Sequence, residues 1–329
     1  MTLLRLSPAA MSRCRFAISP LAETLRSLIV LRRADCEPWQ ARWHAENQPA
    51  YRAWLDRDPV AAGLTSLVSA TKWLPDTVTP PPRGGVHTRL ADELADVATQ
   101  PDHAVRATMR DAVAASWCRQ DTGWLTTSDL APRITAVLAE GWRRFVAPDW
   151  PRRRALLERD IMHRAGVLAA YGWQRAVAGM TRQSAWVGPD AIRFSDQDWP
   201  DRLIAEDGLV FVPHTGGSGS WTCERPPRYA LVYPARGGAS EPSVTGPDAL
   251  AGLLGAGRAR VLRELVRPAT STQLAAALGV SLGTVSAHLA VLRDAGTVAG
   301  ARAGRHVVYR RTDRGEALAA LLDPGTDPA

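Results

Sequence analysis

Hydroxyl side chains and one imidazole gather around residue 284, interspersed with small residues. The members of this set, which we call the recognition residues, are Ser281, Leu282, Gly283, Thr284, Ser286, Ala287 and His288. Serine, threonine and histidine side chains hydrogen-bond to base edges and to phosphates. Leu282, Gly283 and Ala287 would permit close approach or touch thymine methyl groups. The chemistry that this set predicts is recognition of duplex DNA in the major groove.

A predicted helix would position these residues. Ser281 can cap a helix that runs from Leu282 to about Ala295, and Gly296 closes it. Val285, Leu289 and Leu292 share one stripe of that helix, so we expect them to face a core. The recognition residues then lie on the remaining sides, nearest its N-terminal end. These are the positions that meet base edges when a helix enters the major groove.

A shorter helix is predicted just before it, over residues 273–278. Residues 270–272 offer an N-cap, and Gly279 suits a tight turn because glycine takes positive φ without steric strain. A short helix, a glycine turn and a capped longer helix are typical of a helix-turn-helix. We expect Thr272 and Gln273 to anchor the short helix to phosphate.

Two short strands, residues 297–302 and 305–310, follow around Ala303 and Gly304 and predict a β-hairpin. The arginines of this wing could straddle backbone phosphates or enter a minor groove; they are Arg302, Arg305, Arg310 and Arg311. We expect Arg302, Arg305 and His306 to make the wing contacts. Residues 255–314 contain ten arginines and three acidic residues, a net charge of +7. The formal charge of the whole chain is also +7. Nearly all basic residues are arginine, a bias expected of a GC-rich genome whatever the protein does, so the total charge is weak evidence for DNA binding. The concentration of positive charge in residues 255–314 is better evidence for it.

The run Ser281-Leu-Gly-Thr-Val-Ser-Ala-His-Leu289, followed by Leu292-Arg-Asp-Ala-Gly296 and a basic hairpin, resembles the ArsR-type winged-helix regulators over residues 248–322. The resemblance implies a homodimer that represses transcription at an inverted-repeat operator. Metal-sensing relatives carry a Cys-x-Cys box before or on the first helix of the motif. The equivalent residues 266–273 contain no Cys, His, Asp or Glu, so we expect no metal sensing there.

The rest of the chain predicts a mainly α fold with small β elements, an α+β class. Helical spacing covers residues 19–33, 86–99, 103–118, 131–147 and 149–171. A further single helix is predicted from residue 249 to Pro268. Strands are predicted at 191–194, 208–213 and 229–233. A glycine-rich linker at 235–246 separates a region of residues 1–240 from the domain at 248–322. Well-patterned sequence begins only at Cys14, which makes Met11 an alternative start.

Residues 1–240 carry no catalytic pattern. Residues 216–220 lack the second glycine of a nucleophile elbow and the lysine of a phosphate-binding loop, so we interpret them as a mobile hairpin loop. The cysteines and histidines show no metal-binding spacing, and no cofactor is predicted. No run approaches eighteen apolar residues, and Arg13 and Arg15 interrupt the N-terminal segment. We therefore expect neither a membrane span nor a secretory signal, and a cytoplasmic chain.

The role of this region stays open. Segments 15–25 and 233–237 resemble an N-terminal extension, without assigned activity, of some ArsR-type regulators. The twelve tryptophans favour core and interface packing over an aromatic pocket for an effector. The leading hypothesis is a DNA-binding regulator whose N-terminal region senses a small-molecule effector of unknown identity. The alternatives are an enzyme with an accessory winged helix and a protein-interaction module.

Overall fold

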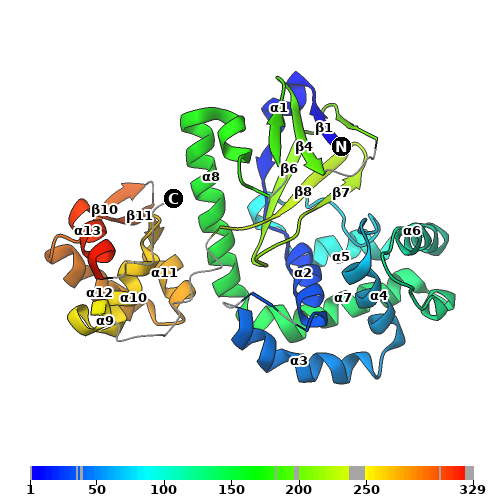
Figure 1. Cartoon of the computed structure of the whole chain (residues 1–329), viewed down its shortest axis with the longest axis horizontal. Helices are drawn as coiled ribbons and strands as arrows, with labels where there is room; N and C mark the ends of the chain where they lie inside the picture. The colour runs from blue at the N-terminus through cyan, green and yellow to red at the C-terminus, as the bar shows by residue number, and fades with distance from the viewer. Residues whose placement is uncertain are drawn as a thin grey trace. The chain divides into compact units, whose positions relative to one another are not determined.

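The computed structural model describes residues 2–34, 36–37, 40–181, 184–195, 200–236, 249–303 and 305–322. The chain divides into two units, Met1–Asp149 with Arg164–Ser240, and Trp150–His163 with Glu241–Ala329 (Figure 1). Both units contain helices and strands, and in the first unit the main helices precede a run of six consecutive strands, so the predicted α+β class is confirmed. The linker expected at 235–246 lies outside the described residues from 237 onward. Within the described ranges, no single helix combines the length and apolarity needed to cross a membrane.

Seven helices of the first unit are described: α1 (Pro8–Arg13), α2 (Pro20–Arg32), α3 (Ala41–Leu55), α4 (Pro59–Ala70), α5 (Leu90–Ala98), α6 (Asp102–Ala114) and α7 (Leu130–Gly141). The helix α8 (Trp150–Val177) follows, with a break in helical geometry at Gly172. The expected N-cap of α2 is present, since Ser19 Oγ accepts a hydrogen bond from the N–H of Ala22 at 2.9 Å. The helices predicted between residues 19 and 171 are confirmed as α2, α5, α6, α7 and α8, with shifted ends.

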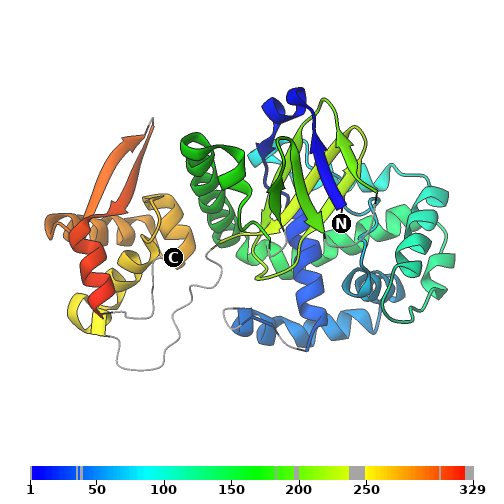
Figure 2. The ribbon, with the colours of Figure 1, turned by 45° about the horizontal axis from the view of Figure 1, so that its top comes forward.

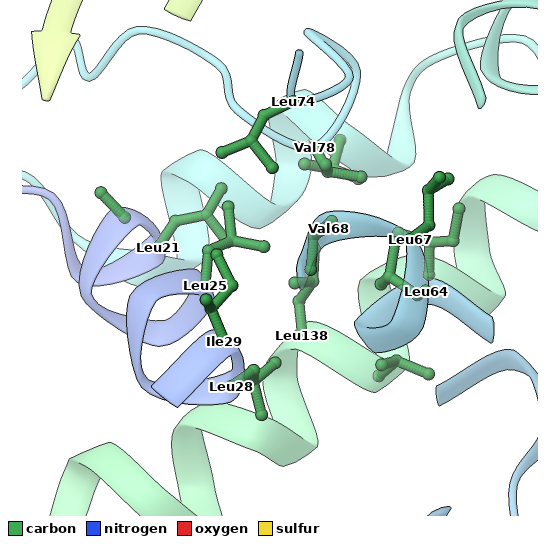
Figure 3. Close-up of a cluster of buried hydrophobic side chains, with 14 of the residues drawn as sticks. Leu21, Leu25, Leu28, Ile29, Leu64, Leu67, Val68, Leu74, Val78 and Leu138 are labelled. Atoms are coloured by element: carbon green, nitrogen blue, oxygen red, sulfur yellow. The ribbon is translucent and has the colours of Figure 1, made fainter. Parts of the chain in front are cut away.

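The helical core forms around α2, whose residues 20–31 are all buried. A helix buried on every side belongs in the middle of a core. Figure 3 shows its leucines meeting side chains of α4 and α7, and the labelled set is Leu21, Leu25, Leu28, Ile29, Leu64, Leu67, Val68, Leu74, Val78 and Leu138. Each such side chain contributes roughly 1.5–3 kcal/mol through its removal from water.

Two four-stranded sheets complete the first unit. One has the order β3-β4-β1-β5, formed by Ala185–Val187, Ala191–Ser195, Thr2–Leu6 and Arg202–Ile204. The other has the order β2-β6-β8-β7, formed by Arg15–Phe16, Leu209–His214, Arg228–Pro234 and Trp221–Arg225. The predicted strands at 191–194, 208–213 and 229–233 are confirmed as β4, β6 and β8.

Strand β6 lies between two cores. Val210 and Val212 pack into the helical core, whereas Leu209 and Phe211 pack into a second apolar cluster with the strand β1. Successive side chains of a strand point to opposite faces, so both faces of this sheet are covered. Because β6 is buried on both faces, it reads in the sequence as a continuous apolar run rather than an alternating one.

Two sequence interpretations are wrong in this unit. Patterned sequence does not begin only at Cys14, because residues 2–6 form the inner strand β1, which pairs with β4 and β5 and buries Leu4 and Leu6. The alternative start at Met11 stays a prediction. Residues 216–220 are not a hairpin loop, because β8 lies between the strands β6 and β7 that they connect. Both errors have one cause: strand neighbours that are distant in sequence leave no local signal.

Tryptophans serve the packing of the first unit. Trp54, Trp124 and Trp221 are buried in its core. The indole of Trp124 occupies the space beside Gly63, where an added Cβ would lie 2.1 Å from it. Trp173 stacks on Phe211 with 5.1 Å between ring centroids. Trp117, by contrast, is 62% exposed. Trp39 lies outside the described residues.

The second unit contains α9 (Ala249–Leu254), α10 (Ala256–Glu264), β9 (Ala269–Thr270), α11 (Ser271–Leu278), α12 (Leu282–Asp294), β10 (Val298–Ala303), β11 (His306–Arg311) and α13 (Asp313–Leu322). Its sheet has the order β10-β11-β9. The single helix expected from residue 249 to Pro268 is wrong, because Gly255 takes a φ of +84° and separates α9 from α10. Figure 2 shows β10 and β11 extending beyond these helices as a two-stranded arm.

Candidate nucleic-acid interface

Helices α11 and α12 form the predicted angular pair. Gly279 takes a φ of +66° at the end of α11, and the chain bends by 115° between the two helices. This angle falls within the range of helix-turn-helix motifs. The tight turn needs the left-handed conformation that glycine adopts without strain, so the sequence prediction at Gly279 is confirmed.

The start of α11 is held by a reciprocal cap. Thr270 Oγ1 accepts a hydrogen bond from the N–H of Gln273, and Gln273 Oε1 accepts one from the N–H of Thr270 at 2.8 Å. We expected Gln273 to reach phosphate, but its side-chain carbonyl oxygen is engaged in this capping box. Its amide nitrogen lies 3.5 Å from the sulfur of Met162 in the same unit. Thr272 is exposed at the first turn, and its contact with phosphate stays a prediction.

Helix α12 separates an inner stripe from an outer surface. Val285, Leu289 and Leu292 are at most 2% exposed and join the core of the unit. The exposed recognition residues are Ser281, Leu282, Gly283, Thr284, Ser286 and Ala287. Ser281 Oγ accepts a hydrogen bond from the N–H of Thr284 at 3.1 Å and lies 2.8 Å from its hydroxyl. The two hydroxyls therefore form one small polar surface at the helix N-terminus, where backbone N–H groups also favour phosphate.

His288 occupies a different environment from the other recognition residues. It is half-buried, and its ring lies against α10: a Cβ added to Gly257 would stand 2.4 Å from His288 Nε2. The absence of a side chain at Gly257 therefore makes room for the imidazole. His288 therefore helps to seat α12 on α10.

The wing presents cations on both of its faces. Arg302 pairs with Val307, and Ala299 pairs with Arg310, so alternation places Arg302 and Arg310 on opposite faces. Both arginines are exposed, as are Arg305 and His306 near the tip. Gly304, expected in the turn, lies outside the described residues. A hairpin with cations on both faces can contact phosphates on two sides of a groove.

Arg311 does not belong to this exposed set, contrary to the sequence interpretation. It is 8% exposed; its Nε donates to the carbonyl oxygen of Leu262 at 2.7 Å and its Nη2 to that of Arg263 at 3.0 Å. Its Nη1 also pairs with Glu316 at 3.0 Å. Arg311 lies opposite Val298 in the strand register, on the side of the hairpin that faces the core. The sequence signal that could have identified Arg311 as buried is its place opposite the apolar Val298 in the hairpin, because paired residues point to the same face of a sheet.

A family model described as a helix-turn-helix domain matches residues 258–299. The chain carries a helix-turn-helix domain. The match spans α10 to the start of β10 and includes all the recognition residues, but neither the wing beyond residue 299 nor any residue before 258. Neither the comparison with curated proteins nor that with solved structures found a match. The helix-turn-helix domain supports a DNA-binding regulator of transcription.

Proposed function

We propose that the protein is a sequence-specific, DNA-binding transcriptional regulator of the ArsR type, acting in the cytoplasm as a homodimeric repressor. In this proposal α12 enters the major groove and the wing follows the adjacent backbone. Ser281, Thr284 and Ser286 hydrogen-bond to base edges or phosphates. Arg302, Arg305 and Arg310 contact phosphates, while Arg311 holds the wing to α10.

One observation carries the proposal. The exposed side of α12 bears small and hydroxyl residues at its N-terminal end, whereas its other side is anchored by Val285, Leu289 and Leu292. Leu282 is 50% exposed on that same surface. An apolar side chain beside hydroxyls suits a thymine methyl group next to base-edge acceptors.

Exposed leucines support the dimer. Leu253 on α9 is 63% exposed and Leu321 on α13 is 77% exposed, and these two helices pack together in the unit. Burial of such side chains against a second copy would remove apolar surface from water. Leu253→Glu with Leu321→Glu should therefore yield a monomer in light scattering, with Leu282→Glu as the control that stays dimeric.

The first unit is proposed to bind an effector and to report it to the DNA-binding domain. A unit of more than two hundred residues far exceeds what dimerisation of a small DNA-binding domain requires. The proposal assigns no catalytic activity and no metal to it. Among the described residues, no group of three or more His, Cys, Asp or Glu side chains is placed to hold a metal ion.

The decisive experiment is selection of duplexes from a random library by the full-length protein, followed by affinity measurement on the enriched sequence. We expect a palindromic consensus and a dissociation constant that rises steeply between about 50 and 200 mM salt, because phosphate contacts release counterions. A reporter carrying the consensus between promoter and gene should lose expression when the protein is present.

Two results would count against the proposal. An absence of sequence enrichment with salt-independent binding would contradict DNA recognition altogether. An enriched sequence that raises reporter expression would retain DNA recognition and contradict only the repressor assignment.

A further inference from the structure

Arg26, in the first unit, is a buried cation that lacks a hydrogen-bond acceptor at Nε. Its side chain is 5% exposed, and no described residue accepts a hydrogen bond from its buried Nε. Burial lowers the pKa of Arg26 to about 10, the repulsion of Arg33 adds to that effect, and Glu23 and Glu37 oppose it, so the guanidinium remains charged at pH 7. A buried charge without full hydrogen bonding is unfavourable in a folded protein. The missing acceptor is therefore a feature to explain.

A glycine-rich loop covers this guanidinium. The loop, residues 215–220, connects β6 to β7. A Cβ added to Gly216 would lie 2.1 Å from Arg26 Nε, and one added to Gly219 would lie 3.3 Å from Arg26 Nη1. Two glycines thus allow the backbone to run directly over the length of the side chain. A loop that needed only to connect strands would have no use for such an approach.

The base of the loop is fixed by hydrogen bonds. Glu23 accepts from both the N–H of Thr215, at 2.9 Å, and its hydroxyl. His214 Nδ1 accepts from the N–H of Gly216 at 3.0 Å, and its ring stacks on Trp221 with 5.4 Å between centroids. The far part of the loop differs, because residues 217–220 are exposed or half-exposed. His214 Nε2 also lies 2.9 Å from the carbonyl oxygen of Gly219, so one imidazole holds the loop at two points while residues 217–220 stay accessible beside the guanidinium.

The charges around the loop favour one class of ligand. Glu37 lies against Gly217, where an added Cβ would stand 2.5 Å from its Cγ, and Glu23 lies at the base of the loop. Two carboxylates so close to Arg26 would repel a dianion more strongly than a monoanion. A planar carboxylate also matches the fork of guanidinium donors better than a tetrahedral group does.

We propose that Arg26 and the loop 215–220 form a binding site for the carboxylate group of a small molecule. The carboxylate accepts hydrogen bonds from the guanidinium of Arg26 and from N–H groups of residues 217–220, and enters through the exposed tip of the loop. This site belongs to the first unit alone, so it stands independently of DNA binding by the second.

The test uses the full-length protein without DNA and follows its thermal unfolding in sodium acetate, with sodium chloride of equal ionic strength as the reference. A site with a dissociation constant near 10 mM should raise the unfolding midpoint by about 3 °C at about 100 mM acetate. Inorganic phosphate at equal ionic strength is the second probe. We expect a saturable shift with acetate and none with phosphate.

Three variants locate the effect. Arg26→Met removes the donors while keeping an unbranched apolar side chain, so the protein should fold without loss of midpoint in chloride and show no acetate shift. Glu37→Gln removes a competing carboxylate at an exposed position and should reach half of the acetate shift at a several-fold lower concentration. Arg110→Gln, at an exposed position of α6, is the matched control and should behave like the wild type.

Several outcomes would overturn the proposal. A shift with phosphate alone would refute the carboxylate class, and no shift with either anion would refute the site. An unchanged shift in Arg26→Met would place acetate elsewhere. If that variant fails to fold, Glu37→Gln decides, because an unaltered or weaker acetate response there contradicts a ligand beside Arg26. None of these results bears on the selected DNA sequence.

Discussion

Arg311 Nε donates a hydrogen bond to the carbonyl oxygen of Leu262 at 2.7 Å, which attaches the last wing strand to the end of α10. The last carbonyl groups of a helix lack partners within the helix itself. Here the carbonyl oxygens of Leu262 and Arg263 accept turn hydrogen bonds from the N–H groups of Leu265 at 3.2 Å and Val266 at 3.1 Å, and Arg311 adds a charged donor to both. The orientation of the wing thus depends on an arginine that contacts no nucleic acid in our proposal.

Arg311 and its neighbour Arg310 should therefore respond differently to the same change. Arg311→Met should lower the free energy of unfolding by about 2–3 kcal/mol, because buried carbonyls lose a charged donor. Arg310→Met should leave stability within about 0.5 kcal/mol and weaken DNA binding instead. Chemical denaturation and DNA titration of both variants provide the measurement. Equal stability of the two variants would refute the structural role of Arg311.

Thr284 and Arg305 should separate sequence preference from general affinity. Thr284→Val keeps the shape and the N–H that Ser281 caps but removes the hydroxyl, so discrimination between bases at one position should change by about tenfold. Arg305→Gln should weaken all sequences alike and reduce the salt slope by about one. Competition binding with single-base variants of the selected duplex distinguishes the two effects. A uniform loss with Thr284→Val would remove Thr284 from base recognition.

Gly257 and His288 should be energetically coupled. Gly257→Ala places a Cβ 2.4 Å from His288 Nε2, so the ring must move and the second unit should lose about 1–3 kcal/mol of stability. In the background of His288→Ala the same substitution should be nearly neutral, because the obstructing ring is gone. A double-mutant cycle on the unfolding free energy measures this coupling. A coupling energy near zero would contradict the packing of His288 against α10.

Glu93 should make the stability of the first unit fall as pH rises. Its carboxylate accepts hydrogen bonds from Ser19 and from the N–H of Leu21, but burial raises its pKa from 4.5 to about 8. Between those values the unfolded chain has lost the proton that the folded protein keeps, so stability present below pH 4.5 is lost progressively up to about pH 8. Glu93→Gln should reduce this slope in thermal unfolding across that range. Asp92→Asn, at an exposed position of the same helix, should leave it unchanged.

Some slope should persist in Glu93→Gln, since burial also raises the pKa of Asp76 to about 7. His214 acts in the opposite direction: burial lowers its pKa to about 4, so its contribution is lost as pH falls below 6.5. A Glu93→Gln variant with the full wild-type slope would show that Glu93 is ionised in the folded protein.

A chain that starts at Met11 should lose much of its stability. It lacks β1, which lies between β4 and β5 and buries Leu4 and Leu6. Removal of a strand from inside a sheet leaves two unpaired edges and an uncovered apolar face. We expect aggregation or a markedly lower unfolding midpoint for the first unit, while the second unit keeps its midpoint. Equal midpoints for the full and shortened chains would contradict a structural role for β1.

The sequence by itself determined the helix-turn-helix, α11 and α12, to within a few residues. Ser281 caps α12, Gly279 makes the turn, and Val285, Leu289 and Leu292 form the inner stripe, as their spacing predicted. These features depend on caps, on helical period and on glycine conformation, which act between residues a few positions apart. The same local signals located α2 and the strand β6.

Tertiary structure alone decided which arginines are buried and which strands are neighbours. Nothing near Arg26 in the sequence announces a glycine loop from residues 215–220 above it, and nothing before Cys14 announces the pairing of Leu4 with Ile192. Arg302 and Arg311 look alike in the chain, yet one is exposed and the other bonds to a helix end. The reason is physical: burial and partnership are set by side chains that arrive from distant elements, and a window of sequence contains only one of the two partners.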